Sequence, residues 1–162
     1  MFSRFKIISI MMTVFAVGAL HAQDLQNQRI RKLQGSKTAI YLTSGIFHTG
    51  GGPKVESELK AIRHSYSSKS GYERLVFDFK TPKMPKVYGH ISSEEKKVYL
   101  DFFDTSIGQE LNSFGSSKYV ESVNIFPLSR DSLSVELVLK DKLSADIFWL
   151  ENPGRLVIDL KM

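Results

Sequence analysis

The sequence predicts an all-β protein in which two four-stranded antiparallel sheets pack as a sandwich. Three observations support this fold class. Apolar and polar residues alternate over several short segments, no stretch keeps a helical period, and the order of four such segments recurs once along the chain. The strand pattern begins near residue 58, after an N-terminal region of different composition.

Residues 1–22 have the layout of a secretory signal peptide. Arg4 and Lys6 precede an uncharged, largely apolar run over 7–20, and Ala22 ends the segment. The run has about fourteen residues, which is shorter than the ~20 that a spanning helix needs. Cleavage after Ala22 is therefore favoured over an uncleaved anchor. We expect a periplasmic protein with no membrane span once the signal is removed.

Composition narrows the classes of ligand and chemistry. No cysteine occurs, which excludes thiolate metal sites, cysteine nucleophiles and a lipoprotein anchor. The net charge of +5 includes Arg4 and Lys6, and without them 20 basic residues face 17 acidic ones, a balance of +3. These basic residues are dispersed, whereas nucleic-acid binders concentrate them on one face. We expect no nucleic-acid partner, and the mild positive charge favours a polyanionic envelope polymer or an anionic lipid surface.

Residues 23–57 are typical of a flexible leader. The stretch 24–37 is polar and rich in Gln, Lys and Arg, and the Gly-Gly-Gly-Pro run at 50–53 breaks both helices and strands. Between them, residues 37–47 carry several apolar and aromatic side chains. These form either one extra strand or an adhesive segment that becomes ordered on a partner. We expect a flexible leader with one transient strand.

The segments after Glu58 alternate with a period of two, as half-buried strands do. In the segment 74–79, Leu75, Phe77 and Phe79 take one face, and Arg74, Val76 and Asp78 take the other. The same alternation holds at 97–102, 134–139 and 155–160, with the inward sets Val98, Leu100 and Phe102, then Val135, Leu137 and Leu139, then Leu156, Ile158 and Leu160. Arg155 and Asp159 therefore face outward.

Four strand segments recur in the same order, which predicts an internal twofold repeat. The offset between matching segments drifts only from 61 to 58 residues. Asp101 and Asp159 hold the same place in the two closing segments. We expect one β domain over 58–162, with repeat units at about 58–104 and 119–162. The matches pair 59–64 with 120–125, 75–79 with 135–139, 87–91 with 146–150, and 98–102 with 156–160.

Three stretches of this domain resemble the AMIN domain, a small β module of periplasmic N-acetylmuramoyl-alanine amidases and type IV pilus secretins. They are Ala61-Ile62-Arg63, the segment 74–79, and 148–160 with its Asn-Pro-Gly-Arg turn followed by Leu-Val-Ile-Asp-Leu. The resemblance covers about Glu58 to Met162. The first unit departs from the pattern because residues 92–97 stand where the Asn-Pro-x-Arg turn belongs. The second unit departs because 135–139 lack the Arg and Asp of the segment 74–79.

The resemblance implies binding to peptidoglycan and targeting to the division site, with recognition on the outer faces of the sheets. Arg bridges carboxylates through two bonds, Asp accepts from hydroxyls and amides, and apolar side chains pack on sugar rings. In the simpler interpretation, the charged residues form cross-strand surface ion pairs worth about 0–1 kcal/mol. Trp149 is expected in the core rather than as a sugar-stacking platform. The candidate binding residues are Arg63, Arg74, Asp78, Tyr99, Asp101, Asn152, Arg155 and Asp159.

The sequence offers no active site. The histidines have no metal-ligand spacing, and no serine stands in a Gly-x-Ser-x-Gly setting. We therefore expect no catalytic residue, no metal site and no cofactor. The expected function is a non-catalytic module that binds peptidoglycan and localises to it. The alternative is an accessory protein–protein interaction factor of an envelope assembly, with an amidase, pilus or secretin component as its partner.

Overall fold

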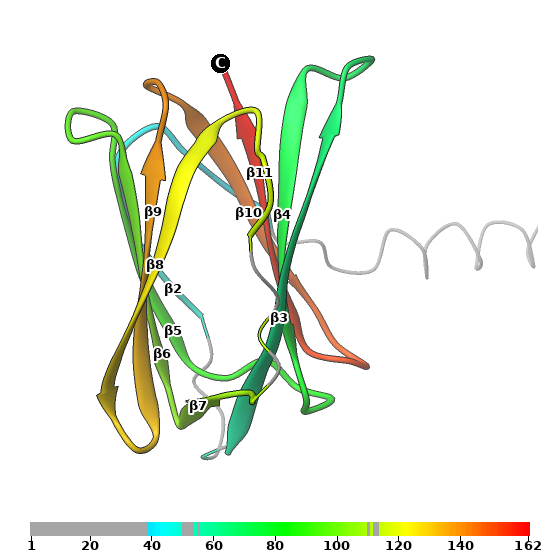
Figure 1. The fold of residues 1–162 in the computed structure, drawn as a ribbon, viewed down its shortest axis with the longest axis vertical. Coiled ribbons are helices and arrows are strands. Elements are labelled where there is room, and N and C mark those ends of the chain that lie inside the picture. Colours follow the sequence, from blue (N-terminus) through cyan, green and yellow to red (C-terminus); the bar gives the residue numbers. More distant parts are fainter. Residues whose placement is uncertain (1–38, 50–53, 55, 110, 112–113) are drawn as a thin grey trace, which may run out of the picture. The chain divides into compact units, whose positions relative to one another are not determined.

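The computed structural model describes residues 39–49, 54, 56–109, 111 and 114–162. In this part of the chain, two β-sheets face each other as a sandwich (Figure 1), and no helix occurs. The predicted all-β class is therefore confirmed. No helix in the described ranges is long and apolar enough to cross a membrane. The predicted signal peptide over 1–22 lies outside the described residues.

The two sheets contain six and five strands rather than four each. Every neighbouring pair is antiparallel except β3 and β7. Sheet A has the order β1 (Ile40–Leu42), β10 (Ser144–Leu150), β11 (Arg155–Lys161), β4 (Tyr72–Phe79), β3 (Ser57–Ser67) and β7 (Thr105–Ile107). Sheet B has the order β2 (Gly45–Thr49), β5 (Val87–Ser92), β6 (Lys97–Phe103), β9 (Ser132–Leu139) and β8 (Val120–Ser129). The four-stranded prediction is wrong because β1, β2 and β7 add strands at the sheet edges.

The core lies between the sheets and is built by the alternating inward faces of their strands. The Phe102 ring of β6 contacts Phe77 and Phe79 of β4, with ring centroids 5.8 and 5.3 Å apart. All twelve side chains predicted to face inward on the four segments are buried. Trp149 packs against this core and is partly buried, in agreement with the expectation. Period-two alternation therefore assigned these faces correctly.

Each predicted repeat unit contributes one hairpin to each sheet. The first unit places β3 and β4 in sheet A and β5 and β6 in sheet B, and the second places β8 and β9 in sheet B and β10 and β11 in sheet A. The strand registers of the two units also agree, and both units carry an irregularity at the same place. A bulge between Leu59 and Ala61 of β3 has its counterpart between Val120 and Ser122 of β8.

One segment match of the repeat is wrong by one residue. Asp101 lies opposite Tyr88, and its counterpart Asp159 lies opposite Asp146. Tyr88 therefore corresponds to Asp146, whereas the sequence match pairs it with Ile147. A shift of one residue exchanges the two faces of a strand, and Ile147 is buried in the core while Tyr88 is exposed.

Part of the predicted leader belongs to the sheets. β1 pairs with β10 in sheet A and β2 pairs with β5 in sheet B, so residues 40–49 extend one edge of each sheet. Phe47 is only 3% exposed, and its ring lies over Gly89, where an added Cβ would come within 2.1 Å of the ring. The expectation of one transient strand is therefore corrected to two strands, one of which inserts an aromatic ring into the core.

Candidate functional site

Four of the predicted binding residues form two ion pairs on the outer face of sheet A. Arg63 donates to both carboxylate oxygens of Asp78, over 2.6 and 2.9 Å. Arg74 donates to both oxygens of Asp159, each over 2.7 Å. In both pairs the side chains that meet belong to neighbouring strands, as the simpler interpretation of cross-strand ion pairs expected.

The Arg74–Asp159 pair is enclosed by its surroundings. The Arg74 guanidinium lies 5.2 Å from the centroid of the Tyr72 ring and 5.4 Å from that of Phe148, and Asp159 is 6% exposed. The hydrogen bond with Asp159 raises the pKa of Arg74 above its ordinary value, and burial only partly opposes this. Both charged groups already form a two-bond charged pair, so a ligand that took the Asp159 carboxylate or the Nε and Nη2 donors of Arg74 would have to break it.

Arg155 and Asn152 lie near one end of sheet A. Arg155 stands directly opposite Asp78, but its Nε is buried and makes no hydrogen bond with a described residue. Asn152 has a positive φ of 59° and lies in the turn between β10 and β11, where its N–H donates to the carbonyl of Pro82 over 2.7 Å. The structure thus gives Asn152 a place in shaping the turn, and Arg155 does not pair with Asp159, whose carboxylate is held by Arg74.

The outer face of sheet B is more open and carries the two remaining predicted residues, Tyr99 and Asp101. Tyr88 is 39% exposed and Phe126 50% exposed. We call this surface the B face. Its two central rows, read from β2 to β8, are Ile46, His90, Tyr99, Glu136 and Asn124, then His48, Tyr88, Asp101, Ser134 and Phe126.

Hydrogen bonds and ring contacts fix the first of these rows. The Tyr99 ring stacks on His90, with centroids 6.0 Å apart and planes 15° from parallel. Its hydroxyl donates to Glu95 over 2.9 Å, and this bond raises the pKa of Tyr99. Glu136 accepts from Lys97 over 3.0 Å and from Asn124 over 3.1 Å, and these bonds, chiefly the one from Lys97, lower the pKa of Glu136.

The second row contains a carboxylate without a partner. Asp101 is partly buried in β6, the middle strand of sheet B, with Tyr88 and Ser134 directly opposite it on the two neighbouring strands. It makes no hydrogen bond or ion pair with any described residue. The B face therefore combines exposed rings, a fixed polar network and an unpaired carboxylate, which suits a ligand with apolar ring faces and polar substituents.

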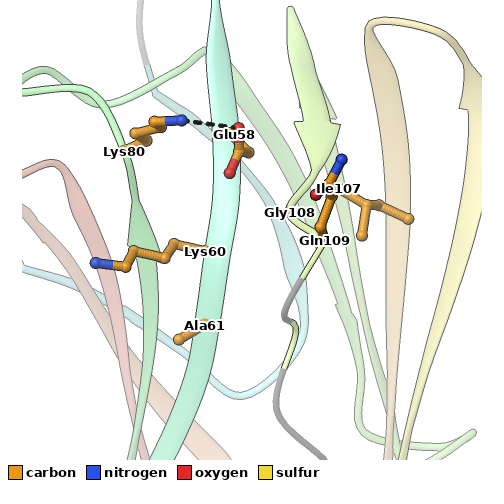
Figure 2. Close-up of a pocket in the computed structure, with 7 residues that line it drawn as sticks. All are labelled: Glu58, Lys60, Ala61, Lys80, Ile107, Gly108 and Gln109. Carbon is orange, nitrogen blue, oxygen red and sulfur yellow. Dashed lines mark hydrogen bonds and ion pairs between the residues drawn. The ribbon is translucent and has the colours of Figure 1, made fainter.

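A polar recess of about 660 Å³ opens beside the β3 and β7 edge of sheet A (Figure 2). Lys80 donates to Glu58 over 3.4 Å, and Figure 2 shows the Lys60 ammonium apart from this pair. No group of three or more metal-ligating side chains occurs among the described residues. The recess could hold a small polar molecule, but its lining brings no nucleophile and base together. It is lined by Glu58, Lys60, Ala61, Lys80, Ile107, Gly108 and Gln109.

The sequence reasoning missed the aromatic part of the B face. Tyr88 has a usable signal, because it alternates with Val87 and Gly89 and so must face outward. Phe126 has none, since its exposure follows from the position of β8 at the end of sheet B. Comparison with known proteins finds no matching family model and no matching curated protein.

Proposed function

We propose that this chain is an exported, non-catalytic module that binds peptidoglycan in the periplasm through the B face. The observation that supports this most directly is the row in which exposed Tyr88 and Phe126 flank the unpaired Asp101 on an open sheet surface. Exposed rings pack against the apolar faces of sugars, and a carboxylate accepts from hydroxyl and amide groups. The resemblance to the AMIN domain supports the same class of ligand and the same place in the cell.

The B face is the better candidate because four of the five charged residues predicted to bind on the opposite face pair with each other, Arg155 being the exception. On sheet A, Arg63 pairs with Asp78 and Arg74 with Asp159, each through two bonds. A ligand there would have to replace bonds already made, and this exchange yields little net free energy. On the B face, Asp101 and the exposed rings lose only contacts with water.

Co-sedimentation with purified sacculi tests the proposal, using the chain from Gln23 onward. The double variant Tyr88→Ala/Phe126→Ala should bind at least several-fold more weakly, since a central aromatic contact is worth ~1–2 kcal/mol. The matched control is Tyr41→Ala, which removes an exposed tyrosine of β1 outside the B face. The proposal fails if the double variant binds as the unmodified chain does, or if Tyr41→Ala causes the same loss.

A second candidate function is that of an accessory interaction factor in an envelope assembly such as a type IV pilus or secretin. β8 is the last strand of sheet B, pairs on one side only among the described residues, and carries Leu128 with 61% exposure. Such an edge accepts a strand from a partner protein. Leu128→Lys should then abolish capture of a secretin, pilus or amidase component while leaving sacculus binding unchanged. Unchanged capture would count against this edge.

A further inference from the structure

Asp101 and Asp159 occupy equivalent positions in the two repeat units. Both lie in closing strands, β6 and β11, and both face outward. Each lies directly opposite one residue of the hairpin contributed by the other unit. That residue is Arg74 for Asp159 and Ser134 for Asp101. The repeat thus allows a direct comparison of two carboxylates in the same backbone setting.

The two carboxylates differ in how their charge is balanced. Arg74 neutralises Asp159 through two bonds of 2.7 Å. Ser134 carries no charge, and Asp101 has no hydrogen bond or ion pair within the described part of the chain. A partly buried carboxylate has lost some of its hydration, so a cation placed beside it gains more than it would in open water. Among the described residues, sheet B therefore places no cation against Asp101, whereas sheet A places Arg74 against Asp159.

The surroundings of Asp101 favour a cation carried on a ring. Tyr88 stands directly opposite on β5, and Phe126 ends the same row on β8. Aromatic faces attract cations through their ring electrons and also pack on sugar rings. The nearby carboxylate of Glu136 is already bonded to Lys97 and Asn124, so Asp101 is the carboxylate of the two central rows that has no partner among the described residues.

We propose that Asp101 binds a primary ammonium group carried by an amino sugar of the ligand, in the place that Arg74 takes beside Asp159. This inference rests on the B face being the binding face, and it adds the chemical group that the face selects. The chain from Gln23 carries 20 basic and 17 acidic residues, a balance of +3, which repels cationic ligands in general. A preference for a cationic saccharide therefore requires a local acceptor.

Titration of the chain from Gln23 with two saccharides of equal length tests the inference. The probes are glucosamine oligomers, which carry free ammonium groups, and N-acetylglucosamine oligomers, which do not. Calorimetry should show at least ~10-fold tighter binding of the free-amine probe. Asp101→Asn should remove this preference, because it lowers the affinity for the free-amine probe by more than the affinity for the acetylated probe. Glu121→Gln, an exposed carboxylate of β8, is the matched control and should keep the preference.

The repeat also supplies a gain-of-charge test at Ser134. Ser134→Arg places the cation of sheet A beside Asp101 and should abolish the free-amine preference to the same extent as Asp101→Asn. Ser134→Gln adds length without charge and should keep the preference. All of these positions face outward, and thermal unfolding of each variant checks that its fold is retained.

The outcomes separate this inference from the proposed function. Retention of the amine preference in Asp101→Asn or in Ser134→Arg overturns the role of Asp101, even if sacculus binding still depends on Tyr88 and Phe126. Equal affinity of the unmodified chain for both probes overturns it as well. Asp101-dependent amine binding without sacculus binding supports the inference and overturns the peptidoglycan proposal. Tighter Asp101-dependent binding of a lysine peptide overturns the amino-sugar assignment in favour of a protein partner.

Discussion

Replacing Phe47 by alanine tests whether residues 40–49 are an integral part of the sandwich. The Phe47 ring is 3% exposed and fills the space above Gly89 on β5. Truncating a buried phenylalanine costs ~3–5 kcal/mol, because apolar contacts are lost and a cavity remains. That is a large share of the ~5–15 kcal/mol by which domains are stable. The melting temperature should fall on the order of 10–20 °C.

Urea and thermal unfolding followed by far-UV circular dichroism measure this loss. The control is Ile46→Ala, one residue away on the same strand, where the side chain is exposed and the expected change is within about 0.5 kcal/mol. A loss below ~1 kcal/mol for Phe47→Ala would refute the reasoning. It would mean that β2 does not pair with β5 in solution and that the domain begins near Glu58, as the sequence suggested.

A double-mutant cycle with Gly89 makes the test specific to this contact. An added Cβ at Gly89 would lie 2.1 Å from Phe47 Cζ, so Gly89→Ala alone forces the ring aside and should cost ~1–3 kcal/mol. Once Phe47 is alanine, the clash is gone and the same substitution should be nearly neutral. The resulting coupling should be at least ~1 kcal/mol. Additive effects would show that the ring does not lie over Gly89.

Three further predictions address the charges and the strand register. Arg74→Ala should lower the free energy of unfolding by ~1–3 kcal/mol, because it leaves the buried Asp159 without its hydrogen-bond donors. The double variant Arg74→Ala/Asp159→Ala should recover part of this stability if the unpaired carboxylate is the cause. Burial raises the pKa of Glu73, but hydrogen bonds from the Tyr119 and Lys118 backbone and the Ser117 and His64 side chains outweigh it and lower that pKa overall. The ionised Glu73 carboxylate therefore stabilises the fold above its unfolded-state pKa of about 4.3, and this stabilisation is lost as the pH falls through the lower folded-state pKa. Glu73→Gln should make the melting temperature depend less on pH in the acid range. Phe77→Asp should unfold the domain while Val76→Asp leaves it folded, and equal damage would contradict the register.

The sequence by itself determined which side chains face the core. Alternation along the segment 74–79 and its three counterparts assigns inward residues from local geometry alone, because successive side chains of a strand point to opposite faces. The internal match also anticipated the hairpins, including the equivalence of Asp101 and Asp159. It failed by one residue at 87–91, because the matching segment 146–150 carries apolar side chains on both faces, with Ile147 and Phe148 both buried.

The tertiary structure alone decided which charges meet and which do not. Arg74 and Asp159 are 85 residues apart, and nothing local indicates that β4 and β11 become neighbours. The order of strands in a sheet depends on how whole hairpins pack. This order places Arg74 opposite Asp159, which it neutralises, and places the uncharged Ser134 opposite Asp101. The strands at 40–49 were hidden for the same reason. Short strands such as β1 and β2 become stable only through pairing with sheet edges, and those edges form from residues 38 or more positions further along the chain.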